Sequence, residues 1–151
     1  MGKSQKRWLM VGGIVGVTAL GCVAWANRRL FLVNDVTTGE SASYPRLRSR
    51  VYYTDVGTAL TTAEQTIRQL PRWRIVLVDA ENNALEAEVE TPIGHFLDDV
   101  TVYCVPLEHG QTRVIIHSRS RTGQGDLGQN AAHIRELQDA MDARLTGDAA
   151  F

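Results

Sequence analysis

The sequence predicts a small α+β domain, with an antiparallel sheet and both helices on one face of it, behind a single N-terminal transmembrane helix. Three observations predict this two-layer sandwich. A long uncharged stretch lies near the start of the chain. Two later segments carry apolar residues three and four positions apart, which is the period of a helix. The other segments are short, alternate apolar and polar residues, and are separated by turns, as in hairpin-connected strands.

Length and composition fit one domain and do not indicate a nucleic-acid partner. The chain has 151 residues and a formal net charge of -1. It is long enough for a modest core, and it lacks the positive charge that draws proteins to nucleic acid. Its two cysteines, Cys22 and Cys104, give neither a disulfide framework nor a zinc-binding spacing. We therefore expect no cofactor.

The uncharged stretch runs from Trp8 to Ala26, which is long enough to cross a bilayer as a helix. Tryptophan stands at both ends, where amphipathic rings favour the membrane interface. The basic residues of segment 1–7 favour a cytoplasmic N-terminus, with the domain on the other side of the membrane. We predict a retained single-pass anchor in preference to a cleaved signal peptide or to lipidation at Cys22.

The chain divides into five predicted segments. They are a basic N-terminal segment (1–7), the transmembrane anchor (8–26), a linker (27–49), the α+β domain (50–146) and a tail (147–151). The linker is assigned because it is polar and rich in turn-forming residues.

The first half of the domain predicts a strand, a helix and a second strand. Residues 50–54 are rich in strand formers. Asp55 or Thr54 caps a helix that extends to Leu70, where a proline follows. Residues 73–78 then form a strand. The apolar face of the helix consists of Val56, Ala59, Leu60, Ala63, Ile67 and Leu70.

The second half predicts three more strands, over 84–91, 98–105 and 112–121. In the last of them, one face carries Val114, Ile116, Ser118 and Ser120, and the other carries Arg113, Ile115, His117, Arg119 and Arg121. Short turns between these strands imply antiparallel pairing. The element order is therefore β-α-β-β-β-β-α, which is analogous to helix-grip and TATA-binding-protein-like folds.

A glycine-rich corner precedes the last helix, which we expect to begin near Asp126. Asp126 and Gln129 fit a capping box, and Gly123 and Gly125 permit a tight turn. With Gly128 they complete a G-x-G-x-x-G pattern. A dinucleotide site would need a second parallel strand after the helix, and Asp126 would place negative charge where a pyrophosphate binds. We therefore predict a structural corner.

The candidate ligand- or partner-binding residues are polar and lie in or beside the last two strands: Asp98, Asp99, His117, Arg119, Arg121 and Asn130. Neighbours on a strand point to opposite faces, so Asp98 and Asp99 cannot share a site. We expect Asp99 to join a charge network with the basic residues of the last strand. Asp98 should accept hydrogen bonds from Ser118 or Ser120. Asn130 should brace the preceding corner.

The residue pattern does not predict catalysis. His95 and His117 lack the remaining ligands of a metal site. Ser118 and Ser120 have neither a glycine elbow nor a paired base. We therefore assign no catalytic residue and no metal ligand.

Two blocks of sequence resemble a known family. The first reads NDVTTGES over residues 34–41 and continues to Tyr44-Pro45; the second joins Asp98-Asp99-Val100 to SRSRTGQGDLGQN over residues 118–130. Over about residues 34–146 the chain resembles the DUF1499 family, which has no established activity. The resemblance implies a membrane-associated bacterial protein, so we predict an inner-membrane anchor and a periplasmic domain. Other members carry a Cys-Val-Ser-Ser-like segment in place of residues 34–37, so no role of that cysteine applies.

Together these observations favour a non-enzymatic, membrane-anchored domain that binds a lipid, a small apolar ligand or an envelope protein. One alternative is a hydrolase-like enzyme that uses the Asp98-Asp99 pair with His117 or Arg119. Another is an accessory subunit of a membrane protein complex. The sequence identifies neither the ligand nor the oligomeric state.

Overall fold

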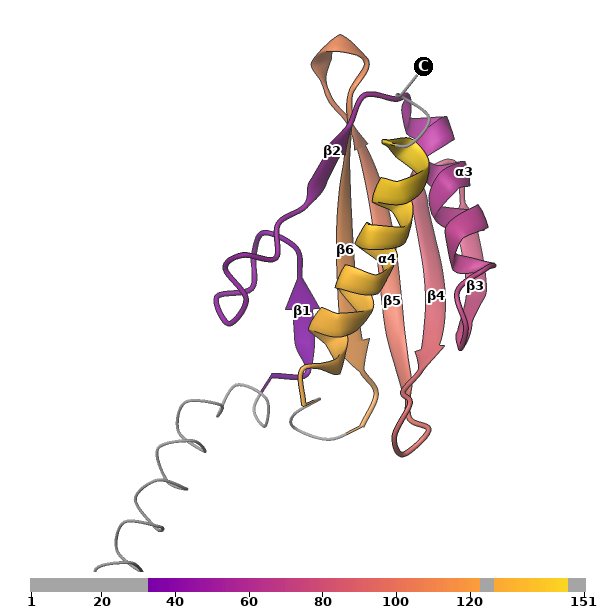
Figure 1. Ribbon diagram of the computed structural model, residues 1–151. Coiled ribbons are helices and arrows are strands. Elements are labelled where there is room, and N and C mark those ends of the chain that lie inside the picture. The colour runs from indigo at the N-terminus through magenta and orange to yellow at the C-terminus, as the bar shows by residue number, and fades with distance from the viewer. Residues whose placement is uncertain (1–32, 123–126, 147–151) are drawn as a thin grey trace, which may run out of the picture.

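The computed structural model of the protein describes residues 33–122 and 127–146 (Figure 1). The predicted anchor from Trp8 to Ala26, and Cys22 within it, lie outside the described residues. Across the described ranges, none of the helices combines the length and the apolar character needed to cross a membrane. The transmembrane helix therefore stays a prediction.

A six-stranded antiparallel sheet forms one layer of the domain, in the order β1-β6-β5-β4-β3, with β2 also pairing with β6. The strands are β1 (Asp35–Thr37), β2 (Arg50–Tyr52), β3 (Trp73–Asp79), β4 (Ala84–Glu90), β5 (Leu97–Pro106) and β6 (Thr112–Ser120). A short 3-10 helix, Glu108–Gly110, turns the chain between β5 and β6. The helices α3 (Val56–Ile67) and α4 (Gln129–Leu145) cover one face (Figure 1). This confirms the predicted α+β architecture.

The start of α3 fits its prediction and its end does not. Asp55 caps the helix, because its Oδ1 accepts a hydrogen bond from the Thr58 amide at 2.9 Å. The helix ends at Ile67, three residues before the predicted Leu70. The amide of Leu70 donates to the carbonyls of both Thr66 and Ile67, at 3.1 and 3.2 Å. The chain therefore tightens into a turn before the following proline, which disfavours helical conformation in the residue preceding it.

The helix α4 begins at Gln129, three residues later than predicted. Its N-cap is Gly128, which has a φ of 83° and so occupies the left-handed region that glycine adopts freely. Gln129 is then the first helical residue and not the third, and the predicted capping box with Asp126 is wrong. Asp126 itself, with Gly123 and Gly125, lies outside the described residues.

The short strand β1 was not predicted, because it lies within the segment 27–49 that reads as a linker. Asp35, Val36 and Thr37 pair with the end of β6, and Val36 is fully buried. Three residues are too few to show alternation, so the pairing depends on contacts distant in sequence. The same segment contributes Tyr44 and Leu47 to the core.

The core lies between the helices and the inner face of the sheet. Side chains from α4 that are fully buried there include Ile134, Leu137 and Met141. They pack with Val100, Val102, Val114, Ile116, Leu85 and Val89 from the central strands. The space between α4 and the sheet is therefore occupied by the protein's own apolar side chains.

Candidate functional site

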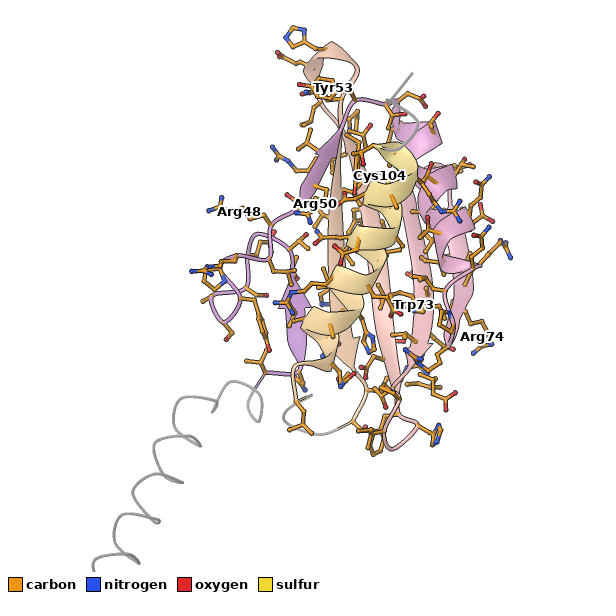
Figure 2. The ribbon with its side chains drawn as sticks, in the orientation of Figure 1. Arg48, Arg50, Tyr53, Trp73, Arg74 and Cys104 are labelled. Atoms are coloured by element: carbon orange, nitrogen blue, oxygen red, sulfur yellow. The ribbon has the colours of Figure 1, made fainter. Side chains whose placement is uncertain are left out.

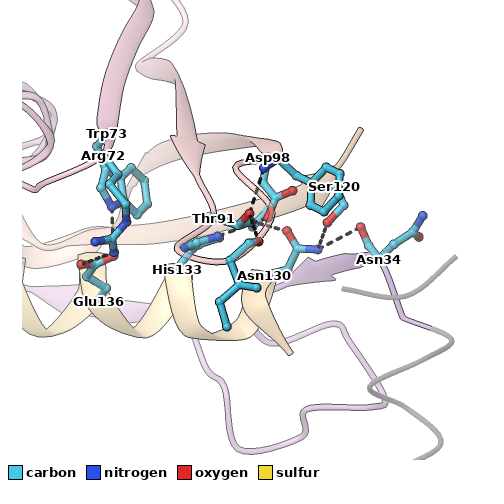
Figure 3. Close-up of polar contacts among 12 residues, drawn as sticks. Asn34, Arg72, Trp73, Thr91, Asp98, Ser120, Asn130, His133 and Glu136 are labelled. Carbon is cyan, nitrogen blue, oxygen red and sulfur yellow. Dashed lines mark hydrogen bonds and ion pairs between the residues drawn. The ribbon is translucent and has the colours of Figure 1, made fainter. Parts of the chain in front are cut away.

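A buried polar cluster lies at one end of the inner face, beneath the first two turns of α4 (Figure 3). Its members are Asp98, Ser118, Ser120, Asn130 and His133. Asp98 comes from β5 and stands opposite Ser120 of β6. Because β5 and β6 alternate their side chains between two faces, these residues point inward with the core.

Asp98 and His133 form the central pair of this cluster. The Oδ2 of Asp98 lies 3.2 Å from Nε2 of His133, and the two residues are only 1% and 3% exposed. The imidazole also meets the ring of Trp73 edge-on, with the ring centroids 6.0 Å apart. Asp98 therefore has a histidine partner in place of the predicted Ser118 or Ser120. His133 was not selected from the sequence, although its spacing to Leu137 and Met141 places it on the buried face of α4.

Asn130 connects three segments that are distant in sequence. Its Oδ1 accepts a hydrogen bond from Ser118 Oγ at 2.6 Å. Its Nδ2 donates to Ser120 Oγ at 3.0 Å and to the backbone carbonyl of Asn34 at 3.1 Å (Figure 3). These contacts fit a bracing role, since they tie α4 to β6 and to the residue that precedes β1.

Asp99 lies on the opposite, outer face of the sheet, as predicted. Arg121 donates from Nε and Nη2 to Asp99 Oδ1, at 2.9 and 2.6 Å, and also pairs with Glu88. Glu88 in turn pairs with Arg74, which lies at the exposed edge of the sheet (Figure 2). The hydrogen bond from Arg121 and the further contact with Arg74 lower the pKa of the Glu88 carboxyl. The hydrogen bonds to Asp99, and then to Glu88, raise the pKa of Arg121.

Of the remaining predicted members of this network, His117 lies elsewhere and Arg119 lies opposite Asp99 on the neighbouring strand. His117 Nε2 is 2.8 Å from Asp35 Oδ1, so it pairs with β1 and not with Asp99. Arg119 is exposed and stands between Asp35 and Asp99 in the sheet register. The predicted cluster therefore divides into an Asp99–Arg121 part and a His117–Asp35 part.

A second polar group fastens α4 to β2. The Tyr52 hydroxyl donates to Asp142 Oδ1 at 2.7 Å, and Arg50 Nε contacts Asp142 Oδ2 at 3.1 Å. Burial, followed by the hydrogen bond to Asp142, raises the pKa of Tyr52. Burial also raises the pKa of the Cys104 thiol to about 11, which makes that thiol unreactive near neutral pH. The contacts of Asp142 therefore join α4 to β2.

The chemistry of these groups is that of satisfied structural contacts. Asp98, Asn130 and His133 are all buried and bonded to other protein groups. In the described part of the chain, no three His, Cys, Asp or Glu side chains are arranged to hold a metal ion.

A protein-family comparison identifies the chain. The model of a protein family of unknown function, DUF1499, matches residues 29–141. The chain belongs to the DUF1499 family. No curated protein matches it in sequence.

Solved structures similar to this DUF1499 domain share little sequence with it. A protein from Arthrobacter aurescens is 16% identical, with a TM-score of 0.48, over 66% of this chain and 84% of its own. Norcoclaurine synthase from Thalictrum is 8% identical, with a TM-score of 0.46, over 77% and 96%. A START superfamily protein from Mycobacterium smegmatis is 8% identical, with a TM-score of 0.43, over 76% and 99%. These scores are too low for their ligands or activities to bear on this chain.

Apart from Tyr53 and from Val76 and Leu77 on β3, the exposed large apolar side chains of the DUF1499 domain form two groups. On the outer face of the sheet, they are Val51, Tyr103 and Val105. At the end of the sheet nearest residue 33, they are Ile93, Phe96, Leu97 and Leu127. An open hollow of about 270 Å³ lies beside β1 and is lined by Val33, Asn34, Asp35, Ser41, Ala42 and Ser43. Exposed groups of this kind mark surfaces of interaction more often than isolated apolar residues do.

Proposed function

We propose that this DUF1499 protein is a non-enzymatic, membrane-tethered domain that binds another envelope protein through the outer face of its sheet. The observation that supports this function is a group of exposed residues on β2, β5 and β6, together with the half-buried Ile115. We call this group the outer patch: Val51, Tyr103, Val105, Arg113 and Ile115. The two helices cover the other face of the sheet and leave this one open (Figure 1).

The strand register brings the outer patch together. Val51 and Val105 flank Arg113 on its two neighbouring strands, and Tyr103 stands opposite Ile115. These positions share one face, because residues two apart on a strand point the same way. Tyr103 is 46% exposed. An aromatic ring, aliphatic groups and an arginine form the composition that is enriched in protein–protein interfaces.

A protein partner is favoured over a small apolar molecule, because the described side chains between α4 and the sheet pack against one another in the core. Ile134, Leu137 and Met141 fill the region between α4 and the sheet, where a buried ligand would lie. The outer patch follows the surface of paired strands, which suits a second protein surface. Ligand pockets, in contrast, are concave and bury most of a small molecule.

The hydrolase-like alternative loses its support from the positions of its residues. Asp98 is buried against His133, and Asp99 is paired with Arg121 on the other face. His117 is occupied by Asp35. A general acid or base must reach the reacting group of a substrate, and these side chains do not converge on a common point.

Photo-crosslinking in the native membrane tests the proposal. A benzophenone amino acid at Tyr103 of the full chain should yield one discrete heavier adduct, which mass spectrometry can identify as a protein. The matched control carries the same group at Arg135, which is exposed on α4 on the opposite side of the domain. Equal adducts from both positions, or none from position 103, would refute binding through the outer patch.

A further inference from the structure

We infer that the end of the domain nearest residue 33 rests on a lipid bilayer and inserts the turn between β4 and β5 into it. We call the exposed apolar residues of this turn, Ile93 and Phe96 with the adjoining Leu97, the membrane tip. The inference rests on the anchored state in the proposed function and adds a second, separate contact with the membrane.

The sheet register places the tip beside the point where the described chain begins. Asp35 pairs with Arg119 near the end of β6, and Asp98 pairs with Ser120 at that same end. The turn of residues 91–96 joins β4 to β5 there (Figure 1). The exposed Leu127, just before α4, lies at this end as well. The β4–β5 turn and the residue preceding α4 therefore both present apolar side chains at the end of the domain where residue 33 lies.

The distance to the membrane is short. Only residues 27–32 separate the uncharged stretch from Val33. Even fully extended, the chain from Ala26 to Val33 spans roughly 25 Å. A domain on such a tether stays within reach of the headgroup layer, and its nearest end meets that layer first.

The side chains of the tip are displayed to solvent. Ile93 is 84% exposed and Phe96 is 55% exposed. Neither residue belongs to the buried core cluster, whereas transfer of apolar area out of water is favourable. The lipid interface is the apolar environment nearest to them, and aromatic rings are well suited to it.

The turn is built firmly enough to hold these side chains outward. The Thr91 amide donates to the Phe96 carbonyl at 2.8 Å, and the Phe96 amide donates to Thr91 Oγ1 at 3.0 Å. Thr91 Oγ1 donates in turn to the Ile93 carbonyl at 2.9 Å (Figure 3). Gly94, with a φ of 82°, lies under the Phe96 ring, and a Cβ there would be 2.9 Å from Cδ2 and closer to Cε2. These hydrogen bonds and the close packing of Gly94 against Phe96 hold the turn in one defined conformation.

The charges around the tip favour lipid contact that does not depend on anionic headgroups. Glu90 pairs with His95, and Arg121 pairs with Asp99. Each of these two basic groups has an acidic neighbour, so neither adds an unbalanced positive charge that would attract anionic lipid. The apolar side chains should therefore insert into a neutral bilayer.

Spin labelling of the full chain in phosphatidylcholine nanodiscs tests the inference. The background carries Cys22→Ser, and Cys104 stays because it is buried. A label at Ile93→Cys should be accessible to oxygen and shielded several-fold from a water-soluble nickel chelate. The matched control is Tyr53→Cys, which is 86% exposed and lies at the opposite end of the domain (Figure 2). It should show the reverse accessibility.

The inference is overturned if the label at position 93 is as open to nickel as the label at position 53, or if the chain does not enter the nanodisc. Phe96→Asp should expose the position 93 label to nickel while leaving the far-ultraviolet circular dichroism unchanged. Leu127→Asp provides the same readout from the neighbouring connection. Crosslinking from Tyr103 reports on the protein partner independently. A result that refutes insertion of the membrane tip can therefore be distinguished from one that refutes the proposed function.

Discussion

Asp98 and Asp99 are adjacent in sequence, yet they occupy different physical environments. Asp98 is buried against His133, whereas Asp99 faces solvent beside Arg121. Strand alternation predicts this division from the sequence. It does not predict the partner of Asp98, because His133 lies on a helix 35 positions away and only tertiary packing brings the two together.

Removing the Asp98 carboxylate should destabilise the domain. Asp98→Ala leaves His133 buried without its partner, and the free energy of unfolding should fall by about 3 kcal/mol. Denaturant unfolding of the full chain in detergent measures this change. Asp99→Ala is the matched control and should cost less, because its carboxylate is half-exposed. An equal decrease in the free energy of unfolding for the two variants would show that the buried Asp98–His133 pair contributes no more than the exposed Asp99–Arg121 pair.

Glu88 should make stability depend on pH on the acid side. Its pKa is lowered in the folded state by Arg121 and Arg74. Folding therefore favours the ionised form of Glu88. The stability that this carboxylate contributes is fully present above the ordinary carboxyl pKa. It is lost as the pH falls through the lowered value. Melting temperatures between pH 7 and pH 3 should fall less steeply for Glu88→Gln than for the parent; Glu86→Gln, at an exposed position on the same strand, should follow the parent.

At the scale of single elements, local patterns explain much of what the sequence predicts. The helical period predicts α3, and Asp55, one of the two residues expected to cap this helix, is its N-cap. The start of α4 was misplaced, because a side-chain cap was expected where Gly128 turns the chain with its backbone. The sequence predicts a break between strands 84–91 and 98–105. It does not predict the hydrogen bonds within the turn, because they involve Thr91, which reads as the end of the preceding strand.

The turn at 91–96 offers a direct test of backbone geometry against side-chain contact. Gly94→Ala combines a left-handed backbone with a clash against the Phe96 ring. Gly39→Ala is a matched control with a φ of 83° and no heavy atom within 4 Å of the added carbon. Gly39→Ala should cost about 1 kcal/mol from backbone strain alone. Gly94→Ala should cost more, and the difference should shrink when Phe96→Ala is added. An unchanged difference would mean that the ring contact is unimportant.

At the scale of the whole molecule, the sheet and its two covering helices follow from the sequence because alternation and helical periodicity are local signals. The pairing of β1 with β6 does not, since β1 is three residues long and its partner is about 80 residues away. The candidate polar residues were found individually. The predicted contacts among them are only partly confirmed, because cross-strand and helix–sheet packing determines which of these side chains contact one another.

Asn130 is the residue through which α4, β6 and the start of β1 are held together. Asn130→Ala should lower the free energy of unfolding by about 2 kcal/mol, because buried polar partners lose their hydrogen bonds. Amide hydrogen exchange should accelerate at Thr38 and Ser120, whose amides donate to Ile116 and Asn34 across the β1–β6 junction. Acceleration spread evenly over the domain would instead indicate a general loss of stability.

The antiparallel pairing of β1 with β6 also determines how the domain bears mechanical load. Tension applied through residue 33 runs along the axis of β1, so the hydrogen bonds from the Ser120 and Thr38 amides are sheared together. Bonds that share a load resist better than bonds that are peeled apart one at a time. A pull from the direction of the membrane would therefore meet its main resistance at this three-residue strand, and the rest of the sheet would remain intact until β1 slips.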